Sequence, residues 1–135
     1  MADYFENDIL GRIGKQKYLC NITWRNGQFL MDEPKNVGGN DFGMDPFSTL
    51  LASLAGCTLS TLRMYIDRKE WIIPEINISL NLYQETEGGL TTTIRRKVTF
   101  SGEVSDEQKE RLLIIADKCP ISKLLKGKTI INTTL

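Results

Sequence analysis

The sequence predicts an α+β fold in which one long helix lies between two antiparallel hairpins. Asn26-Gly27 separates two short β-type segments and is a strong hairpin signal, because both residues tolerate positive φ. Gly88-Gly89 separates two longer β-type segments. The uncharged run from Pro46 to Leu62 lies between the hairpins and predicts a helix. Strands and helices in this order are typical of α+β domains with antiparallel sheets.

The first hairpin is expected over residues 17–24 and 28–32, with Arg25 at the mouth of its turn. Period-two alternation places four side chains on one face of the first strand: Tyr18, Cys20, Ile22 and Trp24. Residues 1–14 give no clear signal, although their apolar side chains are compatible with a short element.

The central helix is expected to begin at Pro46, to be capped by Asp45, and to run to about Lys69. Its first half is apolar or small on all sides, which predicts that protein surrounds it. The uncharged run falls short of the roughly 20 residues that span a bilayer. We therefore interpret it as the buried central helix of a soluble fold.

The second hairpin is expected over residues 75–85 and 91–101. Alternation on the first of these strands is clean, and Arg96 lies in register with the apolar residues of the second strand. Ser105 to Gln108 forms a capping box that starts a helix ending near Lys118.

The C-terminal segment is divided by Pro120, which must end or kink the preceding helix. Residues 121–126 can form a short helix that Gly127 stops, and residues 129–134 predict a last strand.

The chain contains no histidine, and this restricts its chemistry. A Ser-His-Asp triad, a Cys-His pair and a histidine-ligated zinc site are all excluded. If the protein is an enzyme, thiol chemistry is its most available route. No bound metal or organic cofactor is implied.

The charges balance, since Lys and Arg number 17 and Asp and Glu also number 17. This argues against nucleic-acid and membrane surfaces that depend on basic charge. It also leaves little repulsion between copies of the chain.

The length of 135 residues predicts a single domain, residues 1–135. The acidic N-terminus does not resemble a signal peptide. Three cysteines without Cys-x-x-Cys spacing argue against a secreted disulfide framework or a four-cysteine zinc site. We therefore expect a cytoplasmic location, where a disulfide is more often catalytic or redox-sensing than structural.

The three cysteines differ in setting. Cys20 shares its strand face with apolar residues and is expected to pack in the core. Cys57 follows Gly56 inside the central helix, where a glycine usually permits close approach by another group. Cys119 precedes Pro120 and becomes the N-cap if the next residues are helical, a position that favours thiolate. A buried, inert thiol is the alternative for Cys57 and for Cys119.

Two segments resemble the OsmC/Ohr family of thiol-dependent hydroperoxide reductases, and in particular its OsmC-like branch. Residues 45–58, Asp-Pro-Phe-Ser-Thr-Leu-Leu-Ala-Ser-Leu-Ala-Gly-Cys-Thr, resemble the family's first cysteine helix. Residues 115–121, Ile-Ala-Asp-Lys-Cys-Pro-Ile, resemble its second cysteine motif. The element order matches from about residue 17 onward.

The resemblance implies an intertwined homodimer with both cysteines near the dimer interface. Cys57 would attack a hydroperoxide and become a sulfenic acid, which Cys119 would resolve as a disulfide. An external dithiol would then reduce the pair. The family also uses an arginine from an early hairpin, a position best matched by Arg25.

The sequence departs from the family pattern at one point. The peroxidase branches carry a glutamate near the start of the cysteine helix, where this chain has Phe47-Ser48. Arg63 and Arg96 remain alternatives to Arg25 in the site.

Three functions are therefore open. The first is thiol-dependent reduction of a small hydroperoxide in an oxidative-stress response. The second is binding of a small apolar ligand on the same scaffold without peroxidase activity, which the missing glutamate favours. The third is a structural or interaction module, which rests only on the balanced charge and the expected dimer.

Overall fold

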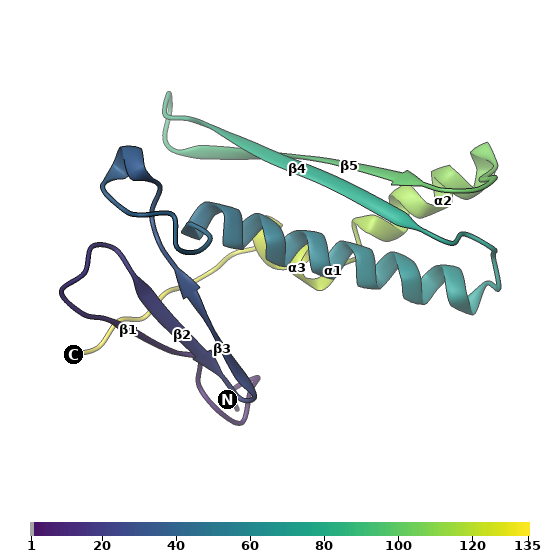
Figure 1. Cartoon of the computed structure of the whole chain (residues 1–135). Coiled ribbons are helices and arrows are strands. Elements are labelled where there is room, and N and C mark those ends of the chain that lie inside the picture. Colours follow the sequence, from purple (N-terminus) through teal and green to yellow (C-terminus); the bar gives the residue numbers. More distant parts are fainter. Residues whose placement is uncertain (1) are drawn as a thin grey trace. The chain divides into compact units, whose positions relative to one another are not determined.

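The computed structural model describes residues 2–135 and has the expected α+β architecture (Figure 1). The chain divides into two compact units, one ending at Leu50 and the other covering Leu51–Leu135. Each unit is described by itself below, and the single-domain assignment stays a prediction.

The first unit contains a three-stranded antiparallel sheet in the order β1-β2-β3. Its strands are β1 (Leu10–Ile13), β2 (Cys20–Trp24) and β3 (Gly27–Met31). Trp24 pairs with Gly27, so the turn consists of Arg25 and Asn26 and lies one residue earlier than the sequence predicted. Gly27 is needed for a different reason, because a Cβ there would lie 2.5 Å from the Trp24 ring.

The carboxylate of Asp32 organises the loop after β3. Its two oxygens accept backbone N–H groups of Tyr18 (3.3 Å), Glu33 (2.8 Å), Asn40 (3.2 Å) and Phe42 (3.2 Å). Burial by itself raises the pKa of Asp32, but these four bonds reverse that effect and hold the pKa below its usual range. One buried anion therefore fixes the segment that contains the short 3₁₀ helix η1 (Lys35–Val37).

Helix α1 (Pro46–Arg68) begins as the sequence predicted. The Asp45 carboxylate accepts the Ser48 backbone N–H at 3.2 Å and also the Ser48 hydroxyl. These bonds, led by the one from the Ser48 side chain, lower the pKa of Asp45. Asp45 is thus the expected N-terminal cap.

The second unit contains a two-stranded hairpin and the remaining helices (Figure 1). Strands β4 (Ile76–Glu85) and β5 (Thr91–Phe100) pair antiparallel over their whole length. Helix α2 (Asp106–Ala116) has both bonds of the predicted capping box, and α3 (Pro120–Lys126) ends at Gly127. Buried residues of α1, of α2 and of the segment before β4 form the core: Leu62, Tyr65, Ile66, Ile73, Leu112, Ile115 and Ala116.

Three expectations differ from the structure. Residues 10–13 form β1, whereas residues 129–134 form no strand, because no strand of the described chain pairs with them. Within residues 2–135 nothing packs against Gly56, since a Cβ there would meet no atom of another element within 4 Å. The first half of α1 is also not enclosed by its own chain: Leu54 and Thr58 are buried, while Ala52, Ser53 and Ser60 are exposed.

Among the described residues, α1 is the one helix long and apolar enough to cross a membrane by length and composition. Core helices of soluble proteins meet the same criterion. Leu62 and Ile66 of α1 are completely buried in the core of the second unit, which supports the interpretation as a core helix.

Replacing Asp32 with asparagine is expected to loosen the loop after β3. An amide offers one acceptor oxygen, and its NH₂ group would face N–H donors. Amide hydrogen exchange at Asn40 and Phe42 should become faster, while exchange at Leu30 in β3 changes little. Glu33→Gln, which has no such role, is the control. In the native protein the pKa of Asp32 is lowered, so its contribution is present at neutral pH and lost only as the pH falls through that lowered value.

Candidate active site

The site lies entirely in the second unit, where α1 and the start of α3 bring two thiols together. Cys57 is half-buried on α1, and Cys119 is completely buried at the N-cap of α3. Both cysteines are free. Their side chains lie close enough to interact, since each shifts the pKa of the other. Two thiols far apart in the sequence therefore share one site.

Cys119 occupies its position because of the local sequence. Pro120 at the first helical position fixes φ and lacks an N–H, so α3 begins there and Cys119 becomes the capping residue. The Cys119 sulfur accepts the backbone N–H of Ser122 at 3.3 Å. On its other side the Thr58 hydroxyl of α1 lies 3.8 Å from the sulfur. The sulfur is thus surrounded by hydrogen-bond donors in a buried position.

The surroundings shift the two thiol pKa values in opposite directions. Burial raises the pKa of Cys57, and the neighbouring Cys119 raises it further. Burial also opposes ionisation of Cys119, but hydrogen bonds from Ser122, Cys57 and Thr58 outweigh it and lower the pKa of Cys119 to about 7. At neutral pH the negative charge of the pair therefore resides mainly on Cys119.

Arg96 of β5 lies beside this pair and is held on three sides. Its Nη1 donates to the Thr58 hydroxyl oxygen at 2.9 Å and to the Ser122 hydroxyl oxygen at 2.8 Å. Its Nη2 donates to Asp117 Oδ1 at 2.9 Å. The Arg96 side chain is only 15% exposed. The two hydroxyls that Arg96 binds are those that flank Cys119.

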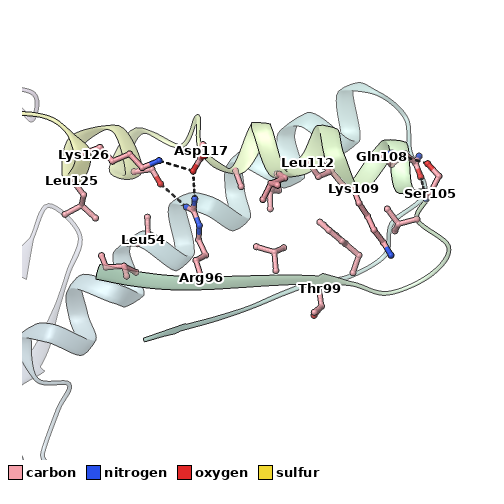
Figure 2. A pocket seen from close by; sticks show the side chains of 18 of the residues that line it. Leu54, Arg96, Thr99, Ser105, Gln108, Lys109, Leu112, Asp117, Leu125 and Lys126 are labelled. Carbon is pink, nitrogen blue, oxygen red and sulfur yellow. Dashed lines mark hydrogen bonds and ion pairs between the residues drawn. The ribbon is translucent and has the colours of Figure 1, made fainter. Parts of the chain in front are cut away.

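Figure 2 shows Arg96 reaching from its strand to Asp117, which also accepts a hydrogen bond from Lys126 Nζ at 3.1 Å. These three charged residues lie along a cavity of about 1480 Å³ in the second unit. Most of its wall is apolar, including Leu54, Leu62, Val98, Phe100, Leu112 and Leu125. Neither cysteine lines this cavity, whereas Arg96 and Ser122 do.

Of the other candidates, Arg63 lies on α1 in the second unit, where it donates to the Ile73 carbonyl oxygen at 2.9 Å and pairs with Asp67 at 3.2 Å. Arg25 and Cys20 lie in the first unit. Arg25 is exposed in the β2–β3 turn, and its role in the site stays a prediction. Cys20 is half-buried on β2, and its thiol donates to the Tyr18 carbonyl oxygen at 3.6 Å. Cys20 is not one of the buried core residues, so the expected packing in the core is not seen. Within residues 2–135, no group of three or more Cys, Asp or Glu side chains could hold a metal ion.

Sequence reasoning did not assign a chemical role to Thr58, Ser122 or Asp117. Each gives a weak signal: Thr58 is a polar residue directly after Cys57, and Ser122 stands three positions after Cys119. Arg96 gave a stronger signal, as a charged residue in an apolar strand register. The arrangement can form a reversible disulfide, because one thiol is accessible and the other is readily ionised.

Comparison with known proteins identifies the family. The family model described as OsmC-like protein matches residues 38–134, which include both cysteines, Arg96 and Asp117. A search of curated proteins gave no match.

Solved structures share the fold at low sequence identity. An OsmC like protein from Mycoplasma pneumoniae has a TM-score of 0.70 and 21% identity, covering 93% of this chain and 90% of that chain. An organic hydroperoxide resistance protein OsmC from Legionella pneumophila has a TM-score of 0.68 and 17% identity, covering 91% and 92%. The organic hydroperoxide resistance protein OhrB of Bacillus subtilis has a TM-score of 0.64 and 23% identity, covering 93% of both chains. The fold and the match to the family model together establish that this chain belongs to the OsmC-like family.

Proposed function

We propose that this protein reduces small hydroperoxides through the thiols of Cys57 and Cys119. The observation that carries the proposal is the interacting thiol pair, in which a half-buried sulfur lies beside a buried and readily ionised one. Two solved structures with the same fold are described as organic hydroperoxide resistance proteins, which supports the same reaction class.

The reaction has three balanced steps. The Cys57 sulfur attacks the hydroperoxide, the O–O bond breaks, and the products are a Cys57 sulfenic acid and an alcohol. The Cys119 sulfur then attacks the sulfenic sulfur, and water leaves as the disulfide forms. An external dithiol reduces that disulfide to two thiols and is itself oxidised to a disulfide.

Cys57 is assigned the first attack because it is accessible, whereas Cys119 is completely buried in the chain. Its raised pKa leaves Cys57 protonated at rest, so it needs a proton acceptor. The neighbouring Cys119 thiolate is that acceptor. The two thiols titrate as one coupled pair. The negative charge of this pair can therefore move from Cys119 to Cys57 when a peroxide arrives.

Arg25 is proposed to hold the peroxide or the Cys57 thiolate, as the family arginine does. The chain lacks the glutamate that pairs with this arginine in peroxidase branches, since Phe47 and Ser48 occupy the corresponding stretch. Arg96 is the arginine that lies beside the thiol pair within the second unit. We therefore assign Arg96 a separate role below.

We further propose that the working form is a homodimer in the cytoplasm. The first half of α1 exposes small residues, and Met64 on the same helix is 71% exposed. A helix of this composition is normally covered by protein. Proteins of this family are typically dimeric. A second copy of the chain is the occupant that fits both observations.

Removal of either thiol is expected to stop turnover. With cumene hydroperoxide and an excess of dithiol, Cys57→Ser should consume no peroxide above background, because the attacking sulfur is gone. Cys119→Ser should react slowly and only once, because it lacks both the proton acceptor for Cys57 and the resolving thiol, and it should accumulate oxidised Cys57. Cys20→Ser is the matched control and should retain the rate of the parent protein. Equal turnover by the parent and Cys57→Ser would exclude the proposed reaction.

The rate of peroxide consumption should rise with pH through neutrality. The pKa of Cys119 is lowered to about 7, and its ionised form is the one that accepts the Cys57 proton. The rate is therefore low below this pH and approaches a plateau above it. Stopped-flow measurement of the first oxidation step gives this profile. A rate that does not change with pH around neutrality would contradict the assignment of Cys119 as proton acceptor.

Gly56→Ala distinguishes the dimer from the isolated chain. A Cβ at Gly56 meets open space in the chain, so better helix propensity should stabilise a monomer by about 1 kcal/mol. In a dimer packed closely at this face, the added methyl group should weaken association instead. Sedimentation equilibrium measures the dissociation constant, and Ser60→Ala on the same exposed face is the control. A monomeric parent protein would rule out the dimer directly.

The alternative function is binding of a small apolar ligand, and the largely apolar cavity of about 1480 Å³ favours it. Native mass spectrometry of freshly purified protein separates the two functions. A co-purified ligand together with thiols that do not react with peroxide would support binding. An empty protein with peroxide-sensitive thiols would support reduction.

A further inference from the structure

We propose that Arg96 is a positioning residue for Cys119. Arg96 acts through the hydroxyls of Thr58 and Ser122, which hold the Cys119 sulfur as a thiolate. This inference rests on the proposed function for its role in the reaction. Its structural content, a link between an arginine and a buried sulfur through two hydroxyls, is independent of any peroxide.

The hydrogen bonds between Arg96 and the two hydroxyls have a fixed direction. An arginine side chain only donates, whereas each hydroxyl carries a single proton and can also accept. Arg96 Nη1 has two protons and gives one to Thr58 Oγ1 at 2.9 Å and the other to Ser122 Oγ at 2.8 Å. Both hydroxyl oxygens therefore act as acceptors toward Arg96, and their own protons must go elsewhere.

The hydroxyl protons of Thr58 and Ser122 have few acceptors within reach. Thr58 Oγ1 lies 2.8 Å from the Leu54 carbonyl oxygen and 3.8 Å from Cys119 Sγ, so its proton is shared between these two acceptors. The Ser122 backbone N–H lies 3.3 Å from the Cys119 sulfur, and the Ser122 side chain also lowers the pKa of Cys119. An ionised sulfur is the stronger acceptor and draws both hydroxyl protons toward itself. The positive charge of Arg96 strengthens each of these bonds by polarising the hydroxyls.

Asp117 keeps the Arg96 guanidinium in place. Asp117 binds the other terminal nitrogen of Arg96, Nη2, at 2.9 Å, while its own side chain is 58% exposed. Lys126 Nζ shares the same carboxylate oxygen at 3.1 Å. Figure 2 shows this Arg96–Asp117–Lys126 arrangement. The carboxylate thus orients the guanidinium, and Lys126 offsets part of its negative charge.

The hydrogen bonds of Arg96 go beyond what a structural ion pair requires. A purely structural arginine on a strand face needs one carboxylate partner, which Asp117 supplies. Arg96 instead places both protons of one nitrogen on the two hydroxyls next to the sulfur. The charged and titratable groups brought to this network are Cys57 from α1, Arg96 from β5, Asp117, and Lys126 from α3.

The consequence for the reaction concerns the disulfide-forming step. A Cys119 thiolate attacks the Cys57 sulfenic sulfur, the S–S bond forms, the S–O bond breaks, and the departing hydroxide takes up a proton as water. Loss of Arg96 should leave more Cys119 protonated, and this should slow both disulfide formation and the first oxidation, since the Cys119 thiolate also accepts the Cys57 proton. The sulfenic acid would then persist and be oxidised further to sulfinic acid.

The test titrates Cys119 without any peroxide. In a Cys57→Ser background, thiolate absorbance in the far ultraviolet gives the pKa of Cys119 directly, and Cys20→Ser removes the remaining thiol. Adding Arg96→Met should raise this pKa by at least about one unit, which is a roughly tenfold smaller ratio of thiolate to thiol at neutral pH. Arg95→Met on the same strand is the matched control, because Arg95 is exposed, and it should leave the pKa unchanged.

A second pair of variants protects the test against a misfolded Arg96 variant. Thr58→Val and Ser122→Ala each remove one hydroxyl and leave Arg96 intact, and each should raise the pKa of Cys119. The two changes combined should leave Arg96→Met with little further effect, since the guanidinium then has no hydroxyl to act through. Circular dichroism checks that each variant is folded. An unchanged pKa in folded Arg96→Met, or in both hydroxyl variants, overturns the inference.

A separate measurement distinguishes this inference from the proposed function. Once one equivalent of cumene hydroperoxide has been consumed, dimedone trapping should capture more Cys57 sulfenic acid per peroxide consumed in Arg96→Met than in the parent protein. If the parent protein never reacts with peroxide but Arg96→Met still raises the pKa of Cys119, the proposed function fails and the positioning role stands. If the parent protein turns over and Arg96→Met leaves both the pKa and the trapping unchanged, the positioning role fails alone.

Discussion

The completely buried sulfur of Cys119 is the constraint on which the site depends. A thiol in such a place is ordinarily hard to ionise, because an anion loses its hydration. Here the cost is offset by donors from two elements, the Ser122 N–H of α3 and the Thr58 hydroxyl of α1. Those donors have their positions only if α3 packs against α1 at this level. The packing of the two helices therefore sets both the proximity of the thiols and the acidity of one of them.

The second unit combines a stable core with a reactive end. Leu62 and Ile66 of α1 share the buried core with Leu112 of α2, and this packing anchors the C-terminal half of α1. Cys57 and Thr58 lie on the same helix, one turn or more before this core. A reactive thiol placed on a rigid helix keeps its position without help from mobile loops. The core and the site are thus two consequences of one helix.

Much of the local structure could be predicted from the sequence. Pro120 restricts its own φ, so the start of α3 and the capping position of Cys119 follow from two adjacent residues. The capping box at Ser105 and the paired strands β4 and β5 also follow from short-range patterns. The first turn was displaced by one residue, because Gly27 accommodates the Trp24 ring and is not a turn residue itself. Residues 129–134 have strand-like composition, but no strand of the described residues pairs with them, and a strand requires such a partner.

What the sequence determined by itself is the two hairpins, the three α-helices with their caps, and the two thiols, because these depend on contacts between residues close in the chain. Only the tertiary structure decided that Arg96 is beside Cys119, and that Thr58, Ser122 and Asp117 hold it there. These residues come from α1, β5 and the segment around the start of α3. A hydrogen bond between them depends on how whole elements pack, and no spacing along the chain encodes that distance.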